Sequence, residues 1–502
     1  MIKRERVDLA ILLLASLLLS IYLFFRTYVV SLDGAFQYIP IAKDFVSGLY
    51  GKALSHNQQP FYSFIIAFVY TWIGDFELAG KLISTLFGIL LIFPVYFLGK
   101  RIFDQKIAFL STLFLAIHPY IRRFSADVLK EATYLFFLAG GLWFAWRTIQ
   151  GERRYPYLFI PLLSVLAYLV RPDGVGILIV VFLYILFFKR FNTPGDRWKV
   201  IFLLVLSSFL FFLPYLLHLR ETTGVWTLSR AKTIAWFLGL SGSAGEISLI
   251  DRVLFTLQKL NAEIFSRYHS LYIFLLVVGL WKRRSSLFKG GEGFLLLFCI
   301  LHYVVLFLLV LNITEWGERG TNPAVYFSGR HVLPLVLFSI YWVGEGFVVI
   351  HHWVCNKIVS SRLFLKVWSK KESMIVWTIL FVLIFSVILP KTLKPQRYER
   401  LPEKWAGNWI KNQIGKGQIL FTTIPRVAYY ADGSFERIVL DKERIEKVMG
   451  LMRERNILYL VIRERETIHD PEVAEMIKRD FIELHRFEGK GMDGVIVYKR
   501  VI

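Results

Sequence analysis

Residues 1–25, MIKRERVDLAILLLASLLLSIYLFF, place a basic flank directly before an apolar run over 7–25. A helix needs about 20 predominantly apolar residues to cross a bilayer. No small-residue cleavage site follows the run, so we expect a retained first span rather than a signal peptide that is removed. Because basic residues next to spans stay on the cytoplasmic side, we expect the N-terminus in the cytoplasm.

Ten further apolar runs repeat this pattern in a chain of 502 residues that is 56% hydrophobic. They fall near 82–99, 107–119, 132–147, 157–170, 175–188, 200–217, 271–281, 294–311, 331–350 and 374–390. The segment PFYSFIIAFVYTWIG, 60–74, is shorter, and its Tyr and Trp suit the headgroup zone, which favours an interfacial or re-entrant helix. The sequence therefore predicts a polytopic α-helical protein of the cell membrane with about 11–13 spans.

The net charge of +22 has a simple explanation in such a protein. Short basic clusters, such as GKRIFDQK and WKRRSSLFKG, lie between alternate pairs of apolar runs, as expected for cytoplasmic loops. No soluble basic module is visible, so we expect no nucleic-acid partner. The two cysteines lie far apart, and we expect no disulfide.

The chain changes character near its C-terminus. Residues 1–398 are predicted to form the transmembrane domain, whereas 399–502 have shorter apolar runs and more charge, typical of a small α/β domain. An odd number of spans would export this domain to the extracytoplasmic side. The segment PRVAYYADG, 425–433, is predicted to be a loop whose Tyr429 and Tyr430 either belong to the core or stack on a sugar.

Polar residues gather in the loops that this topology places on the outer face. Outer loops 26–81 and 118–131 are expected to form the site, and two later breaks contribute further polar groups. If the second loop is helical, Asp127 and Glu131 share one side of it. The simpler alternative is that these charges mark span ends, turns and snorkelling side chains. The candidate residues are Asp33, His56, Gln59, His118, Arg122, Arg123, Asp127, Glu131, Arg171, Asp173, Arg330 and His331.

Carboxylates and cations together at a membrane surface suit group transfer from a lipid-linked phosphate donor. The acceptor hydroxyl needs a general base, which a carboxylate provides. The departing lipid phosphate develops negative charge, which Arg, Lys, His or a divalent metal can stabilise.

The order of these motifs resembles the GT-C membrane glycosyltransferases, in the superfamily of dolichyl-phosphate-mannose protein mannosyltransferases and aminoarabinose lipid A transferases. The resemblance covers most of the chain. It rests on SLDGAFQY after the first span, HNQQP before the short apolar helix, AIHPYIRRFSADVLKE, RPDG and GRHVLP. Where relatives carry Arg or a lipid-contacting Lys, this chain has Phe36 and Gln58-Gln59-Pro60; Arg122, Arg123 or Arg330 are candidates to replace those cations.

The resemblance implies transfer of a monosaccharide, with inversion, from a polyprenyl-phosphate donor to a hydroxyl of a protein, lipid or glycan outside the cytoplasm. Asp33 would be the general base, and the other candidate residues would bind donor or acceptor. Asp127 and Glu131 would orient the sugar or hold a divalent metal, which two or three carboxylates suit. Membrane lipids are the remaining expected partners.

Two other function classes stay open. A lipid-linked sugar flippase or another polytopic transporter also needs polar groups beside broken helices. A non-catalytic subunit of a glycosylation complex would not need Asp33.

Overall fold

The computed structural model describes residues 2–152, 156–189, 194–228, 230, 248–315, 324–325, 327–360, 370–438, 450–468 and 471–501. The chain forms two compact units. Unit 1 comprises Met1–Tyr22 and Ile41–Leu393, and unit 2 comprises Leu23–Pro40 and Lys394–Ile502. The loop that follows the first helix therefore belongs to the same unit as the C-terminal residues.

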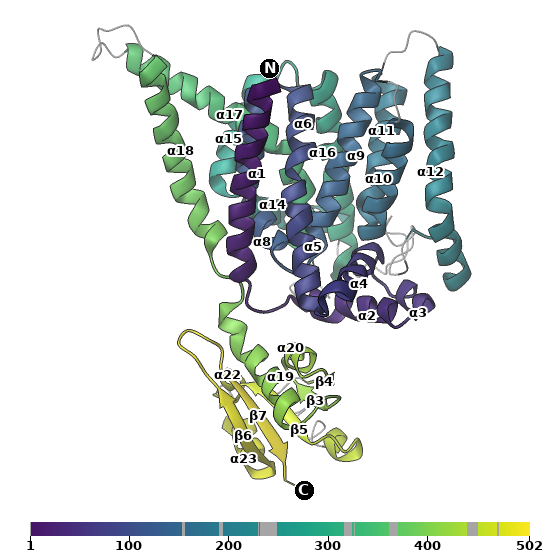
Figure 1. The fold of residues 1–502 in the computed structure, drawn as a ribbon, viewed down its shortest axis with the longest axis vertical. Coiled ribbons are helices and arrows are strands. Elements are labelled where there is room, and N and C mark those ends of the chain that lie inside the picture. Colours follow the sequence, from purple (N-terminus) through teal and green to yellow (C-terminus); the bar gives the residue numbers. More distant parts are fainter. Residues whose placement is uncertain are drawn as a thin grey trace. The chain divides into compact units, whose positions relative to one another are not determined.

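Unit 1 is a bundle of helices, shown in Figure 1. Figure 1 also shows α2 and α3 crossing one end of the bundle instead of running along it. The helices are α1 (Ile2–Phe25), α2 (Ile39–Val46), α3 (Tyr50–Leu54), α4 (Phe61–Ile73), α5 (Phe76–Leu90), α6 (Ile92–Ile102), α7 (Gln105–Ala116), α8 (Pro119–Ser125), α9 (Glu131–Ile149), α10 (Pro156–Val170), α11 (Gly176–Phe187), α12 (Pro194–Thr223), α14 (Leu249–Tyr268), α15 (Ser270–Arg283), α16 (Gly290–Ile313), α17 (Leu333–Ser360) and α18 (Lys370–Leu393). A short antiparallel pair, β1 (Thr314–Glu315) with β2 (Ala324–Val325), follows α16.

The predicted apolar runs fall on these helices, the run 82–99 covering α5 and α6, which confirms the helical membrane architecture. Among the described residues, six helices are long and apolar enough to cross a membrane, and a bent pair makes up to seven. Four shorter apolar helices, of 10–17 residues, accompany them. The chain is a multi-pass membrane protein.

The bent pair is α14 and α15, whose axes differ by 101°. His269 lies at the bend with a φ of 75°, in the left-handed region that residues with a side chain rarely adopt. Its Nδ1 accepts a hydrogen bond from the backbone N–H of Leu271 at 3.3 Å, which caps the second helix. Only the second half of this pair was predicted, because α14 has no continuous apolar run.

Helix α17 occupies the interior of unit 1 and packs closely on α15 and α7. A Cβ added at Gly279 would lie 1.8 Å from the carbonyl oxygen of Trp342, and one at Gly346 would lie 1.9 Å from that of Leu275. Small residues allow such backbone contact between membrane helices. Glu345 of α17 faces α15, where its Oε2 lies 3.1 Å from Arg283 Nη2.

Unit 2 contains a five-stranded sheet in the order β4-β3-β5-β7-β6. The strands are β3 (Ile419–Thr422), β4 (Ser434–Arg437), β5 (Tyr459–Arg463), β6 (Phe481–Phe487) and β7 (Val495–Arg500). β3 runs parallel to β4 and β5, whereas β7 is antiparallel to β5 and β6. The helical segments are η1 (Gly34–Tyr38), η4 (Tyr398–Arg400), α19 (Leu401–Gln413), α20 (Pro425–Tyr430), α22 (Glu464–Ile468) and α23 (Pro471–Asp480).

Alternate side chains of each inner strand enter two different cores, as the pleat of a strand requires. Leu460 and Ile462 of β5 join the core that includes Ile477 of α23. Val461 joins the core that includes Ala406 of α19 and Val427 of α20. The sheet is therefore covered by helices on both faces, which confirms a small α/β domain.

Strand β4 was not predicted, and the prediction of a loop over 425–433 was wrong for 425–430, which form α20. Pro425 opens that helix, where its missing N–H costs no hydrogen bond. The segment DKERIEKVMGLMRERN, 441–456, carries charged pairs at helical spacing that predict an amphipathic helix, but most of it lies outside the described residues.

Candidate functional site

Asp33 stands at the start of the π-helical turn η1, in the part of unit 2 that follows α1. The turn is fixed by Ser31, whose Oγ accepts from the N–H of Gly34 at 3.0 Å and whose carbonyl accepts from Ala35 at 3.0 Å. Single π-turns are rare and occur often at functional sites. The Asp33 side chain is half-buried.

Six other candidate or neighbouring residues form a polar cluster in unit 1. The polar cluster comprises Lys130, Glu131, Arg171, Asp173, Arg330 and His331. It joins three places in the fold: the start of α9, the 3-10 break η2 (Pro172–Val175) between α10 and α11, and the 3-10 turn η3 (Gly329–Val332) that opens α17. All are ends or breaks of helices, where the backbone changes direction.

Arg171 is the centre of the polar cluster. Its Nε and Nη2 donate to the two carboxylate oxygens of Asp173 at 3.1 Å each, and its guanidinium lies 4.8 Å from the ring centroid of Tyr134. Nη2 also lies 2.6 Å from Nδ1 of His331. Because a guanidinium can only donate, that nitrogen of His331 accepts and carries no proton.

The break beside Arg171 depends on glycine. A Cβ added at Gly174 would lie 2.3 Å from the backbone nitrogen of Tyr168. Pro172 cannot donate a backbone hydrogen bond, so the preceding helix ends here. Together the two residues turn Arg171 and Asp173 toward each other. This confirms the predicted break between two apolar helices.

Lys130 and Glu131 reach the polar cluster from the start of α9. Glu131 is almost fully buried, and its Oε1 lies 3.5 Å from Arg330 Nε. Neither Glu131 oxygen has a hydrogen-bond partner among the described residues. Lys130 Nζ donates to Oε1 of Gln58 at 2.9 Å. Burial, followed by the nearby Arg171 charge, lowers the pKa of Lys130 to about 8.

The charges of the polar cluster do not cancel. Lys130, Arg171 and Arg330 are cations and only Glu131 and Asp173 are anions, so with His331 neutral the group carries one excess positive charge. A buried excess charge is unfavourable in a low-dielectric setting without an anion to match it. One further negative charge would neutralise these six residues.

Asp127 and Glu131 would share one side only if the second loop were helical, and it is not helical between them. Helix α8 ends at Ser125 and α9 begins at Glu131, so the residues between them form a turn. Oδ1 of Asp127 accepts from the N–H of Val128 at 2.8 Å, a local bond that competes with helix formation. Both carboxylates still lie within electrostatic range of the Tyr62 hydroxyl.

These two carboxylates do not by themselves make a metal cage. The described residues contain no group of three or more His, Cys, Asp or Glu side chains placed to hold a metal ion. Magnesium commonly binds through one or two carboxylates and takes its other ligands from water and substrate phosphate. The unsatisfied Glu131 oxygens fit that pattern, so metal binding by Asp127 and Glu131 stays a prediction.

His56 and Gln59 belong to other contacts within unit 1. His56 Nε2 lies 2.9 Å from Asp44 Oδ2, and Lys52 Nζ lies 2.7 Å from Oδ1. Burial raises the pKa of Asp44, but the bonds from Lys52 and His56 outweigh it and leave that pKa below its ordinary value. Gln59 is buried, and its Oε1 accepts from the Tyr215 hydroxyl at 2.8 Å.

His118 and Arg122 are completely buried. Nδ1 of His118 accepts from the N–H of Ile121 at 3.4 Å and so caps α8, and burial lowers the pKa of this histidine to about 3. Its ring is therefore neutral at physiological pH. Arg122 Nη1 donates to the hydroxyls of Ser16 and Ser20 on α1, at 2.7 and 3.3 Å. Arg123, the next residue, is half-buried.

Sequence reasoning left several members of this region out of the candidate site. Lys130 was visible in the dense second loop, directly before Glu131, but only the structure brings it to Gln58. His302, whose Nε2 lies 3.0 Å from the His331 carbonyl oxygen, is inside an apolar run and gave no signal. Tyr134 was also missed, although its spacing of three from Glu131 places both on one helical face.

Residues 57–218 match the family model of the dolichyl-phosphate-mannose-protein mannosyltransferases. The matched segment includes Lys130, Glu131, Arg171 and Asp173 of the polar cluster. No curated protein sequence matches the chain.

Three solved structures share the fold at low sequence identity. ArnT from Cupriavidus metallidurans in the apo state has a TM-score of 0.61 at 13% identity, over 99% of this chain and 97% of that chain. ArnT bound to undecaprenyl phosphate has a TM-score of 0.57 at 12% identity, over 99% and 97%. The archaeal oligosaccharyltransferase AglB from Archaeoglobus fulgidus, in complex with an inhibitory peptide and a dolichol-phosphate, has a TM-score of 0.59 at 12% identity, over 98% and 74%.

These likenesses extend over nearly the whole chain, and they agree with the helical unit and the α/β unit described above. The chain therefore has the fold of the GT-C membrane glycosyltransferases.

Proposed function

We propose that this protein transfers a monosaccharide from a polyprenyl-phosphate donor to a hydroxyl of a protein, lipid or glycan acceptor. The GT-C fold supports the reaction class. The family-model match supports the same class over residues 57–218. The undecaprenyl phosphate bound to ArnT and the dolichol-phosphate bound to AglB support a lipid phosphate as the donor's carrier.

The polar cluster is the observation that carries this proposal. It contains one more cation than anions, and it is built at helix ends inside a membrane fold. A lipid phosphate that leaves a sugar needs positive charge and hydrogen-bond donors at its oxygens. Lys130 and Arg330 would supply them, whereas Arg171 donates to both carboxylate oxygens of Asp173. Lys130 would then replace the cation that relatives carry in the segment occupied here by Gln58, which it contacts.

In the proposed reaction, Asp33 is the general base. Its carboxylate takes the proton of the acceptor hydroxyl, and the acceptor oxygen attacks the anomeric carbon. The bond from that carbon to the phosphate oxygen breaks with its electron pair, and lipid phosphate departs. Attack opposite the leaving group inverts the anomeric centre. Asp33 is half-buried, so part of the residue is exposed to solvent.

The remaining candidate residues take supporting roles in this proposal. Arg171, Asp173 and His331 fix the geometry of the polar cluster, whereas His56 and Gln59 border the segment that holds Gln58. A divalent cation bound by Asp127 and Glu131 would supply further positive charge at the phosphate. His118, Arg122 and Arg123 lie on α8 or cap it, and they would act by placing the turn that leads to Lys130.

We also propose the orientation given by the basic loops, with the N-terminus in the cytoplasm and unit 2 outside. Single cysteines introduced at exposed Lys490 and Lys282, in a background without Cys299 and Cys355, test it. A membrane-impermeant maleimide added to intact cells should label the first position and spare the second. Labelling of the second position alone would show that the orientation is the opposite of the proposed one.

Purified protein in proteoliposomes tests the activity against its alternatives. Radiolabelled polyprenyl-phosphate sugars are supplied on one side, and label is followed both into acceptors and across the bilayer. Label that reaches an acceptor, with release of polyprenyl phosphate, supports transfer. Label that crosses the bilayer still attached to lipid identifies a flippase and rejects the transferase. A chelator arm reports whether transfer needs a divalent metal.

A further inference from the structure

The loop that carries Asp33 is held by the C-terminal domain. Residues 26–30 run beside residue 396: the N–H of Gln396 donates to the Arg26 carbonyl at 2.9 Å, and the N–H of Tyr28 donates to the Gln396 carbonyl at 3.2 Å. Arg397 Nε donates to the Val29 carbonyl at 2.9 Å. These contacts all lie within unit 2.

Tyr430 contacts the backbone three residues before Asp33. The backbone N–H of Val30 donates to the Tyr430 hydroxyl at 2.9 Å, and both residues are buried. A buried N–H without an acceptor is strongly unfavourable, so this hydroxyl fixes the backbone three residues before Asp33. On the C-terminal side of Asp33, the rings of Phe36 and Phe435 pack edge to face, with their centroids 5.1 Å apart. The carboxylate thus lies between two anchored points.

Tyr430 is in turn held in place by close packing between two helices. A Cβ added at Gly407 of α19 would lie 2.4 Å from Cβ of Tyr430 and 2.6 Å from the Val427 carbonyl oxygen. Lys404 Nζ lies 5.1 Å from the ring centroid of Tyr430. The tyrosine is therefore confined at its backbone, its ring and its hydroxyl.

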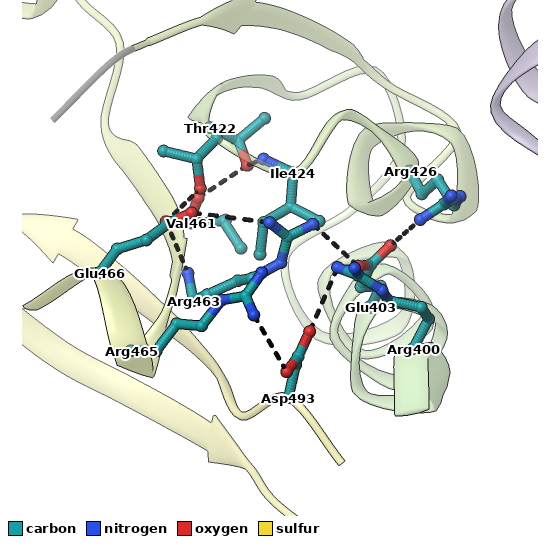
Figure 2. A network of polar contacts seen from close by, with 11 residues as sticks. Arg400, Glu403, Thr422, Ile424, Arg426, Val461, Arg463, Arg465, Glu466 and Asp493 are labelled. Atoms are coloured by element: carbon teal, nitrogen blue, oxygen red, sulfur yellow. Dashed lines mark hydrogen bonds and ion pairs between the residues drawn. The ribbon is translucent and has the colours of Figure 1, made fainter. Parts of the chain in front are cut away.

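Figure 2 shows the ion-pair network that locks these helices to the sheet. Glu403 of α19 is completely buried, and its carboxylate contacts three arginines: Arg400 at 3.1 Å, Arg426 at 2.7 Å and Arg463 at 3.2 Å. Arg426 is in α20, the helix that ends with Tyr430. Arg463 ends β5, so one carboxylate fixes α19, α20 and the sheet together.

Arg397 adds a sign of strain at the entrance to the domain. Its φ is 53°, in the left-handed region, and it is not a glycine. Such a conformation persists only where the surroundings enforce it. The hydrogen bond from its side chain to Val29 is a contact that enforces it.

We propose that the C-terminal domain is a positioning element for the catalytic loop, and that Tyr430 is its positioning residue. This inference rests on the proposed role of Asp33 as base. The hydroxyl of Tyr430 does not react. It holds the Val30 backbone so that the Asp33 carboxylate meets the acceptor in one geometry. Displacement of a reacting group by about 1 Å can cost about 100-fold in rate, so a modest loosening has a large effect.

Tyr430→Phe tests the proposal in the full-length protein. The variant removes the hydroxyl that accepts from the Val30 N–H and keeps the ring. Tyr459→Phe is the matched control, because Tyr459 is in β5 of the same unit and its hydroxyl bonds no described residue of 26–38. Hydrogen exchange of a peptide covering 26–38 reports the contact, and a peptide covering β7 reports whether the domain is folded. Transfer kinetics report its consequence.

We expect Tyr430→Phe to raise the hydrogen-exchange rate of 26–38 at least ~5-fold, which corresponds to the loss of about one net hydrogen bond. The exchange rate of β7 should not change. We expect kcat to fall roughly 5- to 50-fold, with KM for the lipid donor within about twofold of wild type. Tyr459→Phe should match wild type in both. Phe435→Leu, which weakens the contact on the far side of Asp33, should act in the same direction.

The outcomes distinguish a failure of the positioning role from a failure of Asp33 as the general base. Unchanged exchange at 26–38 rejects the contact. Faster exchange with unchanged kcat shows a contact without a positioning role. Full transfer by Asp33→Asn would reject Asp33 as the general base, and the positioning role would be rejected with it. The hydrogen-exchange result would still show whether Tyr430 contacts the loop.

Discussion

Lys130→Met is the substitution that distinguishes a lysine kept for binding from one kept for stability. Burial is the main cause that lowers the pKa of Lys130 from 10.5 to about 8. One pKa unit corresponds to about 1.4 kcal/mol, so holding the charged form there costs about 3 kcal/mol at neutral pH as an upper bound. The side chain is half-buried, and solvent screening reduces the cost to about 1–3 kcal/mol.

The sign of the pH dependence follows from this direction. The folded-state pKa lies below the unfolded-state value, so the unfolded chain binds more protons between about pH 8 and about pH 10.4. Stability due to this group therefore rises with pH across that window and is lowest below it. Methionine removes the charge and its cost, so the ligand-free variant should unfold roughly 2–5 °C higher than wild type near pH 7.

The same substitution should abolish most of the activity. Loss of one preorganised donor to a developing anion lowers kcat by about 100- to 1,000-fold. Lys130→Arg keeps a charge that does not titrate, so it should retain transfer above pH 8, where wild-type kcat/KM declines. Lys411→Met is the control: its Nζ lies 3.9 Å from Asp432 at the surface of unit 2, and its loss should change neither property.

Thermal unfolding in detergent and initial transfer rates across pH 6–10 provide the two measurements. A Lys130→Met protein that unfolds at a lower temperature than wild type would contradict the assignment of this lysine to binding. So would a stable variant that keeps its transfer rate.

The other substitutions address packing and geometry. Gly279→Ala places a Cβ 1.8 Å from a carbonyl oxygen of α17, so the folded fraction in size-exclusion chromatography should drop sharply, whereas Gly51→Ala, with open space around it, should not change it. Arg171→Lys cannot keep both bonds to Asp173, and kcat/KM should fall about 10- to 100-fold with the melting temperature nearly unchanged; a wild-type rate would show that the paired geometry is dispensable. Glu403→Gln leaves three arginines without their buried carboxylate, which should destabilise unit 2 by about 3–5 kcal/mol in denaturant unfolding; an unchanged midpoint would show that the network is incidental.

Sequence patterns predicted the helices that cross the membrane, because the bilayer constrains them strongly. Each apolar run became a helix because no other local structure satisfies its backbone groups in lipid. The break at RPDG was also predictable, since Pro172 and Gly174 cannot continue a helix in that geometry. Helix α14 was missed because its polar residues interrupt the apolar pattern, and only its packing against α16 and η3 shows its place.

The polar cluster could be predicted only in part. Its members were chosen one by one as charges at helix ends, yet the contact between Arg171 and His331 joins residues 160 apart. No local pattern encodes such a pair. Lys130 was passed over because burial, which the sequence does not show, makes its charge unusual. The helix considered through Asp127 does not form, and its side chain accepts from the next backbone N–H instead.

The assignment of 26–38 to the C-terminal unit was beyond sequence reasoning as well. The bond between Val30 and Tyr430 spans 400 residues. The two tyrosines at 429 and 430 suggested either a core or a sugar platform, and Tyr430 is buried with its hydroxyl on the loop backbone. The hydrogen-bond partner of its hydroxyl therefore indicates its role, and sequence spacing does not predict that partner.

The most direct measurement is the initial rate of sugar transfer from a radiolabelled polyprenyl-phosphate donor by wild type, Asp33→Asn and Asp432→Asn. Asp432 is the matched control: it belongs to unit 2, is partly exposed, and has a φ of 53°, which asparagine adopts readily. The account predicts that Asp33→Asn loses at least about 100-fold in kcat while it still binds polyprenyl phosphate, and that Asp432→Asn matches wild type. Equal transfer by all three proteins, folded alike, would contradict it.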